Sequence, residues 1–93
     1  MTVEDIRHTI LNLVDRYAIK HVILFGSRAA GTNNEYSDVD LIMEFSKPIS
    51  LLTLSMIKNE LEEKFRLNVD VIHGPVEPED MIEIENEVVL YAS

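Results

Sequence analysis

The stretch LFGSRAAGTNNEYSDVDL, residues 24–41, organises the rest of the chain. Within it, Gly26 and Ser27 end one apolar run, and after ten intervening residues Asp38 and Asp40 open a second run. Glycine turns and surface aspartates are common, so neither half identifies a site alone. The two halves at this spacing form a specific pattern and predict a site built from both.

The first half predicts a strand that ends in a phosphate-binding turn. His21–Phe25 (HVILF) is short, apolar and bounded by glycine, which is typical of a buried strand. Gly26 allows a close backbone turn, and the N–H groups leading into the short helix-compatible segment 27–30 suit a phosphate group. Arg28 lies in what we expect to be an exposed turn, where it either contacts a triphosphate or is simply solvated.

The second half predicts a metal site. Alternate side chains of a strand share a face, so Asp38 and Asp40 point the same way while Val39 and Leu41 point into the core. Two adjacent carboxylates repel each other unless a cation lies between them. Magnesium takes hard oxygen ligands and is typically held by one or two carboxylates plus substrate phosphates. A phosphate cradle facing such a site indicates phosphoryl or nucleotidyl transfer.

The pattern Gly26-Ser27, ten residues, Asp38-Val39-Asp40 resembles the signature of the DNA polymerase β-like nucleotidyltransferase superfamily. The fuller string GSRAAG…SDVDL is most similar to its smallest branch, the MNT-type minimal nucleotidyltransferases. The resemblance covers nearly the whole chain and implies one minimal nucleotidyltransferase domain over residues 1–93. It also implies a mixed three-stranded sheet backed by helices, with the active site on its open side.

The resemblance further implies two magnesium ions, ATP as substrate and a third carboxylate on a later strand. Asp38 and Asp40 would bind the ions, and Gly26 and Ser27 would hold the nucleotide phosphates. Asp70, in Asn68–Ile72 (NVDVI), is the matching third acid, as metal ligand, base or both. Its own surroundings favour the same interpretation, because a charge centred in an apolar strand needs solvent, a partner or a metal. Glu44 is a further candidate acid, although a solvated carboxylate is the simpler interpretation.

Composition favours one domain, and the interleaved helices and strands predicted below place it in the α/β or α+β class. The chain has 93 residues, is 46% apolar and contains no cysteine, which fits a cytoplasmic protein. No apolar run is long enough to span a bilayer, and the N-terminus does not resemble a signal peptide. With eight Lys and Arg against seventeen Asp and Glu, the net charge of −9 argues against direct nucleic-acid binding. It either keeps the domain in solution or attracts a basic protein partner.

Periodicity predicts four helical segments interleaved with three strands. The expected helices cover residues 3–18, 27–30, 51–65 and 78–91, and the expected strands cover residues 21–25, 38–45 and 67–73. In the last helix, Pro78 opens the first turn and Met81, Ile84, Val88 and Tyr91 form the apolar face.

Three functions remain open from the sequence. The first is AMP transfer from ATP to a tyrosine of a HEPN-type ribonuclease toxin, with this chain as antitoxin in a hetero-oligomer; this comes from the family resemblance. The second is a nucleotide-binding partner subunit that inhibits by occlusion alone. The third is a small-molecule nucleotidyltransferase subunit. Because we expect no room for a separate substrate-binding domain, a partner protein is the favoured acceptor.

Overall fold

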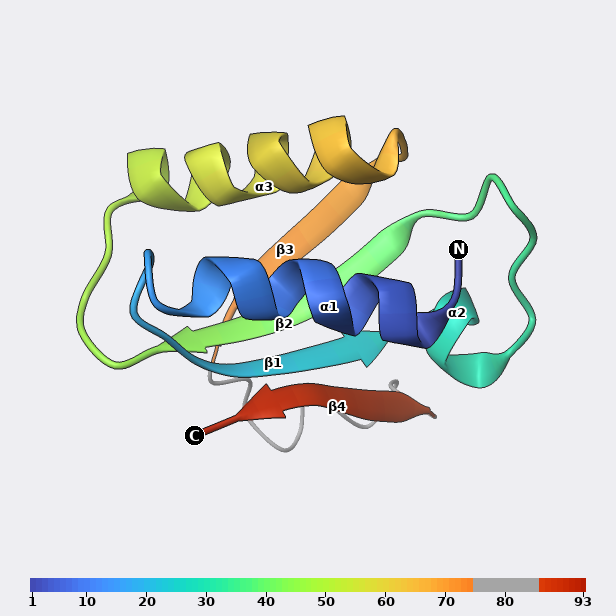
Figure 1. The fold of residues 1–93 in the computed structure, drawn as a ribbon, viewed down its shortest axis with the longest axis horizontal. Coiled ribbons are helices and arrows are strands. Elements are labelled where there is room, and N and C mark those ends of the chain that lie inside the picture. Colours follow the sequence, from blue (N-terminus) through green and yellow to red (C-terminus); the bar gives the residue numbers. More distant parts are fainter. Residues whose placement is uncertain (75–85) are drawn as a thin grey trace.

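The computed structural model describes residues 1–74 and 86–93. Helices and strands alternate along most of the chain, as Figure 1 shows. The elements are α1 (Val3–Val14), β1 (Ile19–Phe25), α2 (Ser27–Ala30), β2 (Val39–Phe45), α3 (Leu51–Phe65), β3 (Val69–His73) and β4 (Glu87–Ala92).

The described strands form one mixed sheet in the order β3-β2-β1-β4. β1 is antiparallel to both of its neighbours, whereas β2 and β3 run parallel. The parallel pair needs a crossover, which α3 provides in the connection from β2 to β3 (Figure 1). The fold class is therefore confirmed as a mixed α/β sheet backed by helices.

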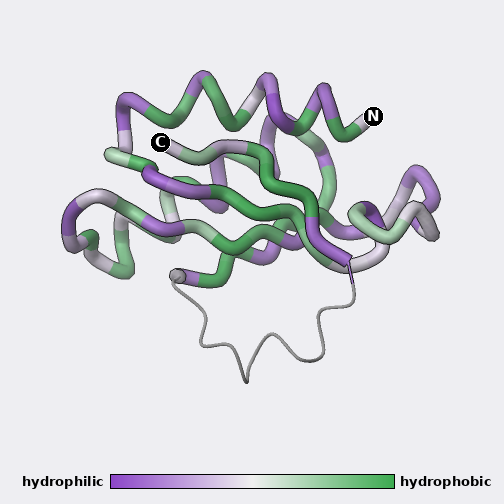
Figure 2. Tube along the Cα trace, turned by 90° about the horizontal axis from the view of Figure 1, so that it is seen from below, coloured by the Kyte–Doolittle hydropathy of each residue, from purple (hydrophilic) through white to green (hydrophobic). Residues whose placement is uncertain are grey.

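The hydrophobic core lies between the sheet and the two long helices. α1 and α3 lie on the same side of the sheet (Figure 1). Apolar and polar residues alternate along the helices, so that each helix has one apolar face (Figure 2). The fully buried core side chains, each under 2% exposed, are Ile6, Ile10, Leu13, Val22, Leu24, Val39, Leu41, Met43, Ile57, Leu61 and Val69. The opposite face of the sheet is thereby left for the residues that alternate with them in the strands.

Local signals set the helix ends. Thr2 and Asp5 form a capping box at the start of α1, and the Ser50 hydroxyl accepts from the backbone N–H of Thr53 at the start of α3. α1 ends at Val14, four residues before the predicted end, because the chain turns there through Ala18 with a positive φ of 53°. β2 begins at Val39, so Asp38 directly precedes the strand.

The prediction of a last helix is wrong over residues 87–92, which form a strand, β4, along the free edge of β1. The sheet therefore has four described strands and not the predicted three. Val88 and Tyr91 both pack on the core, as a helix would require. A β-bulge produces that three-residue spacing: Val89 pairs with Ile23 and Tyr91 with the next residue back, Val22, which leaves Leu90 as the extra residue. Pro78, Met81 and Ile84 lie outside the described residues.

Within the part of the chain that the structure describes, none of the helices has the length and apolarity needed to cross a membrane. The longest, α3, has 15 residues and carries lysine and glutamate side chains.

Truncation of the core is expected to be far more costly than truncation of the surface. Leu61→Ala removes a fully buried side chain of α3 and should lower the free energy of unfolding by about 2–5 kcal/mol. Leu52→Ala, in the same helix, removes a side chain that is 72% exposed and should change it by less than about 0.5 kcal/mol. Urea unfolding followed by circular dichroism measures both, and equal costs would contradict the core described here.

Candidate active site

The turn after β1 is in direct contact with the first catalytic candidate of β2. Gly26 has φ 77° and ψ −158°, a backbone conformation that is essentially restricted to glycine. A Cβ built on Gly26 would overlap Oδ2 of Asp40 and lie 3.3 Å from its Cγ. The antiparallel register explains this approach, because Phe25 at the end of β1 is paired with Asp40 at the start of β2. The two halves of the sequence pattern therefore meet in space.

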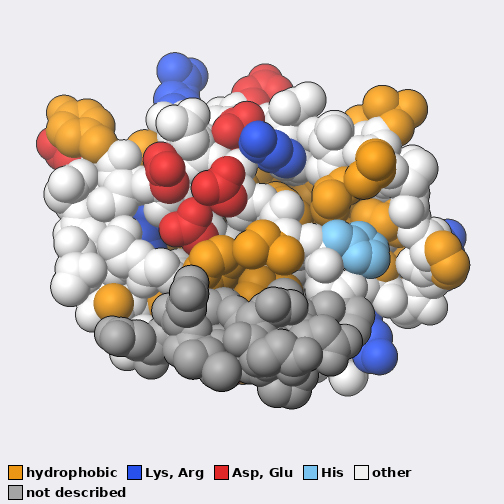
Figure 3. Space-filling model, turned by 180° about the vertical axis from the view of Figure 1, so that it is seen from behind, with side chains coloured by type: hydrophobic (Ala, Val, Ile, Leu, Met, Phe, Trp, Pro, Cys, Tyr) orange, Lys and Arg blue, Asp and Glu red, His pale blue; other side chains and the backbone are white. Residues whose placement is uncertain are grey.

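The parallel pairing of β2 with β3 adds the third acid. Asp40 and Asp70 are register partners, with Val39 and Val69 as the preceding pair. Both valines are fully buried, so both aspartates point to the face opposite α1 and α3. Asp38 is exposed and directly precedes β2. Figure 3 shows acidic side chains gathered on this face, beside an apolar patch.

Electrostatic repulsion within this group is reflected in the behaviour of Asp40. Burial raises the pKa of its carboxyl above the ordinary value of 3.8. The negative charge of Asp70, a hydrogen bond with Asp70 and the negative charge of Asp38 raise it further, in that order. Asp70 and Asp38 are thus electrostatic neighbours of Asp40, and the metal-free protein holds a concentration of negative charge here.

A divalent cation fits this group by the chemistry of its donors. Among residues 1–74 and 86–93, no three His, Cys, Asp or Glu side chains already lie close enough together to hold a metal ion. Magnesium does not require a complete protein cage, since it keeps waters and substrate phosphates as ligands beside one or two carboxylates. The carboxylates of Asp38, Asp40 and Asp70 are the hard oxygen donors that it prefers.

Ser27 opens α2 directly after the Gly26 turn. Backbone hydrogen bonds from Ala30 to the Gly26 carbonyl and from Thr32 to the Ser27 carbonyl hold this turn, at 3.1 and 3.0 Å. The turn thus has a fixed position beside the aspartates. Nucleotide binding by Gly26 and Ser27 stays a prediction. The position of their turn beside Asp40 is compatible with it.

Arg28 differs from the expected exposed turn residue. Its side chain is only 6% exposed, and Nε and Nη2 both donate to the carbonyl oxygen of Ser37, at 3.2 and 2.9 Å. The side chain therefore crosses from α2 to the residue immediately before Asp38 and fixes the end of the loop. A contact between Arg28 and a triphosphate remains a prediction, and the sequence pattern carries no signal for the loop contact.

Glu44 is placed away from the three aspartates. It lies at the far end of β2, where its carboxylate is 2.9 Å from Nδ1 of His21 on β1. The stacked rings of Phe45 and His73 lie at the same end of the sheet, with centroids 5.5 Å apart. The structure therefore favours Asp70 over Glu44 as the third acid of the group.

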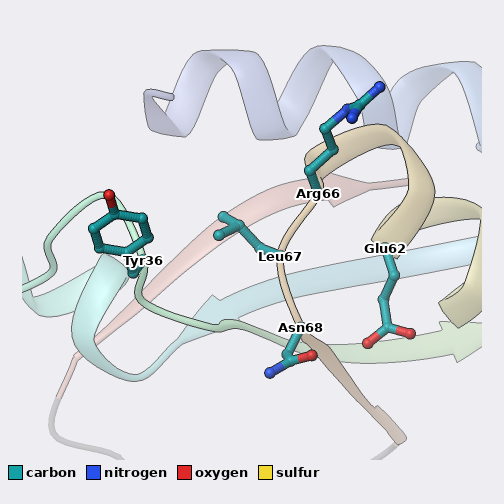
Figure 4. Close-up of a pocket in the computed structure, with 5 residues that line it drawn as sticks. All are labelled: Tyr36, Glu62, Arg66, Leu67 and Asn68. Carbon is teal, nitrogen blue, oxygen red and sulfur yellow. The ribbon is translucent and has the colours of Figure 1, made fainter.

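A groove that the sequence did not predict lies between the loop before β2 and the turn before β3. Its volume is about 410 Å³, and its lining residues are Tyr36, Glu62, Arg66, Leu67 and Asn68 (Figure 4). Tyr36, an aromatic residue 79% exposed in an otherwise polar loop just before Asp38, was the one signal that could have indicated it. The remaining lining residues are brought there by the crossover from β2 to β3.

Sites that transfer phosphoryl or nucleotidyl groups combine a phosphate-binding turn with metal-binding carboxylates. The glycine turn packed on paired strand carboxylates places this protein in that class. The nucleotidyltransferase domain family matches residues 6–91, and the chain belongs to this family of enzymes.

Two relatives show what this chain is similar to. MJ0435 of Methanocaldococcus jannaschii, provisionally named a protein adenylyltransferase, is 34% identical over 90 residues, which cover 96% of this chain and 97% of the relative. The protein adenylyltransferase MntA of Thermococcus cleftensis is 30% identical over 76 residues, which cover 77% of each chain.

Solved structures show the same fold. A structure described as a minimal nucleotidyltransferase matches with a TM-score of 0.74 and 28% identity, over 95% of both chains. A toxin–antitoxin structure with AMP-PNP matches with a TM-score of 0.77 and 16% identity, over 94% of this chain and 73% of the other. A complex of tri-AMPylated Shewanella oneidensis HEPN toxin with MNT antitoxin matches with a TM-score of 0.73 and 14% identity, over 99% and 74%.

Two glycine substitutions should separate backbone strain from the contact with Asp40. Gly26→Ala places a methyl group on the Asp40 carboxylate, whereas at Gly31, with φ 78°, nothing lies within 4 Å of an added Cβ. Gly31→Ala should cost about 1–2 kcal/mol of stability through left-handed strain and keep nucleotide affinity. Gly26→Ala should cost more and abolish measurable binding of Mg·AMP-PNP in calorimetry. Equal nucleotide affinity in the two variants would contradict the role of this contact.

Removal of the Asp40 charge should stabilise the metal-free protein. The pKa of Asp40 is raised in the folded state, so the protonated carboxyl adds to the free energy of unfolding. This contribution is complete below pH 3.8 and is lost as pH rises through the folded pKa. Asp40→Asn should therefore unfold at higher urea than wild type at pH 7 in EDTA, with the difference shrinking at pH 4. The exposed Glu63→Gln has the same charge change and should show a smaller difference. A lower urea midpoint for Asp40→Asn at pH 7 would contradict the repulsion.

Proposed function

We propose that this chain is a magnesium-dependent protein adenylyltransferase that moves AMP from ATP to a tyrosine hydroxyl of a HEPN-type ribonuclease and so acts as its antitoxin. The observation that carries the proposal is the packing of the Gly26 turn on Asp40, with Asp70 as the register partner of Asp40. This arrangement provides a phosphate-binding turn and a carboxylate group in one site, which nucleotidyl transfer requires.

Four matches support the choice of a protein as acceptor. Both relatives carry the name protein adenylyltransferase, and one of them is MntA of Thermococcus cleftensis. The matched toxin–antitoxin structure contains AMP-PNP, and another matched complex contains a HEPN toxin that is tri-AMPylated. The net charge of −9 adds a physical reason, since it favours a basic protein surface over a nucleic acid as partner.

In the proposed reaction, the tyrosine oxygen attacks the α-phosphorus of ATP and forms the new P–O bond. The bond from that phosphorus to the bridging oxygen of the β-phosphate breaks, and pyrophosphate leaves with the electron pair. Asp70 accepts the hydroxyl proton or holds a metal ligand position, since its carboxylate is free of the core. Gly26 and Ser27 hold the departing phosphates through their turn.

Asp38, Asp40 and Asp70 would hold two magnesium ions, which supply charge neutralisation and alignment of the in-line attack. Arg28 supports this group indirectly through the Ser37 carbonyl, and we propose its direct contact with the nucleotide as the lesser of its two roles. The domain would act as a single catalytic unit in a cytoplasmic hetero-oligomer with its toxin.

Mass spectrometry of the partner tests this function. Incubation of the protein with ATP, magnesium and a HEPN-type ribonuclease should add one or more AMP units of about 329 Da each to the ribonuclease and stop RNA cleavage. Asp38→Asn combined with Asp40→Asn should abolish the addition, because the metal ligands are lost. Asp70→Asn should slow it by about 10²–10⁴-fold if Asp70 is the base.

The outcomes separate the competing functions. Full inhibition of the ribonuclease with no mass gain would instead support occlusion. A mass gain that survives in the Asp38→Asn, Asp40→Asn double variant would overturn the site assignment. Glu63→Gln, on the exposed face of α3, is the matched control, because the half-buried Glu62 holds the turn before β3.

A further inference from the structure

The groove between the loop before β2 and the turn before β3 has two ordered walls. On one side, the Tyr36 N–H donates to Oδ1 of Asn34 at 2.8 Å, and Arg28 holds the carbonyl of Ser37. These contacts hold the backbone on both sides of an aromatic ring that is 79% exposed to solvent. An exposed ring on a fixed turn is a wall onto which another molecule can pack.

The other wall follows the end of α3. Glu62 accepts from the backbone N–H of Val69 at 3.0 Å, and the carbonyl of Asn68 accepts from Val39 at 3.0 Å. Arg66 ends the helix in the left-handed conformation, with φ 56° and ψ 37°, and its side chain is exposed. In Figure 4, Leu67 extends from this turn toward Tyr36. The lining thus combines an aromatic ring, an aliphatic group, an amide and one guanidinium.

The groove adjoins the candidate active site. Tyr36 lies two residues before Asp38, and Asn68 lies two residues before Asp70. Because β2 and β3 are parallel and in register, these residues precede the same ends of both strands. The groove has a volume of about 410 Å³ and is broadly open to solvent, as a surface that receives a polypeptide segment must be.

The order of the strands decides which substrate this position suits. From β1 across the sheet come the Gly26 turn, then Asp40, then Asp70 on the edge strand β3, and the groove lies where β2 and β3 begin. In an in-line transfer, the attacking oxygen and the leaving group lie on opposite sides of the phosphorus. Pyrophosphate held at the Gly26 turn therefore places the attacking hydroxyl on the side of Asp70 and the groove.

We propose that this groove is the acceptor subsite and binds the polypeptide segment that carries the tyrosine to be modified. This inference rests on the proposed function and adds the surface that selects its protein substrate. Tyr36 and Leu67 contact the apolar part of the segment, and the Arg66 guanidinium binds a backbone carbonyl or a carboxylate beside the target tyrosine. The tyrosine oxygen then bonds to the α-phosphorus as the bond to pyrophosphate breaks, and its proton passes to Asp70 or, where Asp70 is a metal ligand, to water.

Arg66→Gly tests the subsite without loss of the fold. Glycine is the preferred residue at a left-handed helix end, so the variant should unfold at no lower urea concentration than wild type. With a HEPN-type ribonuclease as acceptor, its KM should rise about tenfold while kcat at saturating acceptor stays the same, as for loss of one charge-assisted contact. Tyr36→Ala should act in the same direction. Lys64→Ala, which removes one exposed cation outside the groove, should keep the wild-type KM.

Calorimetry with Mg·AMP-PNP as the probe provides the second readout, and the nucleotide Kd should be the same in Arg66→Gly and wild type. A weaker Kd would overturn the proposal and assign the groove to the nucleotide. An unchanged acceptor KM in both groove variants would overturn it while the proposed function stands. No AMP transfer by the wild-type protein would instead mark failure of the proposed function, which is visible before any variant is compared.

Discussion

The register of β2 with its two neighbours is the constraint on which the rest of the site depends. Antiparallel pairing with β1 brings the Gly26 turn against Asp40, and parallel pairing with β3 brings Asp70 alongside the same residue. A shift of one residue in either ladder would turn every side chain of the shifted strand to the opposite face. The buried side chains of Val39, Leu41 and Val69 resist that shift, because each would leave the core. The packing of the core therefore determines the geometry of the site.

Repulsion among the aspartates of the site lowers the free energy of unfolding of the domain. Asp40 and Asp70 share one face, Asp38 directly precedes β2, and both burial and neighbouring charge disfavour the ionised form of Asp40. The folded chain retains this arrangement because the same strands bury a large apolar surface on their other face. A bound cation would remove the repulsion, so metal binding and stability are expected to be coupled through these residues.

Arg28 and Tyr36 show how one loop serves two surfaces. The residues between α2 and β2 are mostly exposed, yet the Arg28 guanidinium and the Asn34 side chain hold the backbone on either side of Tyr36. This order sets the start of β2, and with it the approach of Asp40 to the Gly26 turn. It also holds the Tyr36 ring at the rim of the groove. A loop that is polar in sequence is thus part of both the catalytic group and the proposed acceptor subsite.

Features that depend on neighbouring residues could be predicted from the amino-acid sequence. The alternation in residues 38–45 placed Val39 and Leu41 in the core, Gly26 marked the strained turn, and Thr2 and Ser50 marked helix starts. Features that depend on distant partners arise only in the folded protein. The chain from 87 to 92 became an edge strand because β1 offered it an unpaired edge, and a bulge gave its core residues a helix-like spacing. Arg28 became buried because the Ser37 carbonyl lay within its reach, and the groove formed because the crossover from β2 to β3 brings the end of α3 beside the loop that carries Tyr36. Such contacts join residues that are not neighbours in the chain, and no local pattern encodes them.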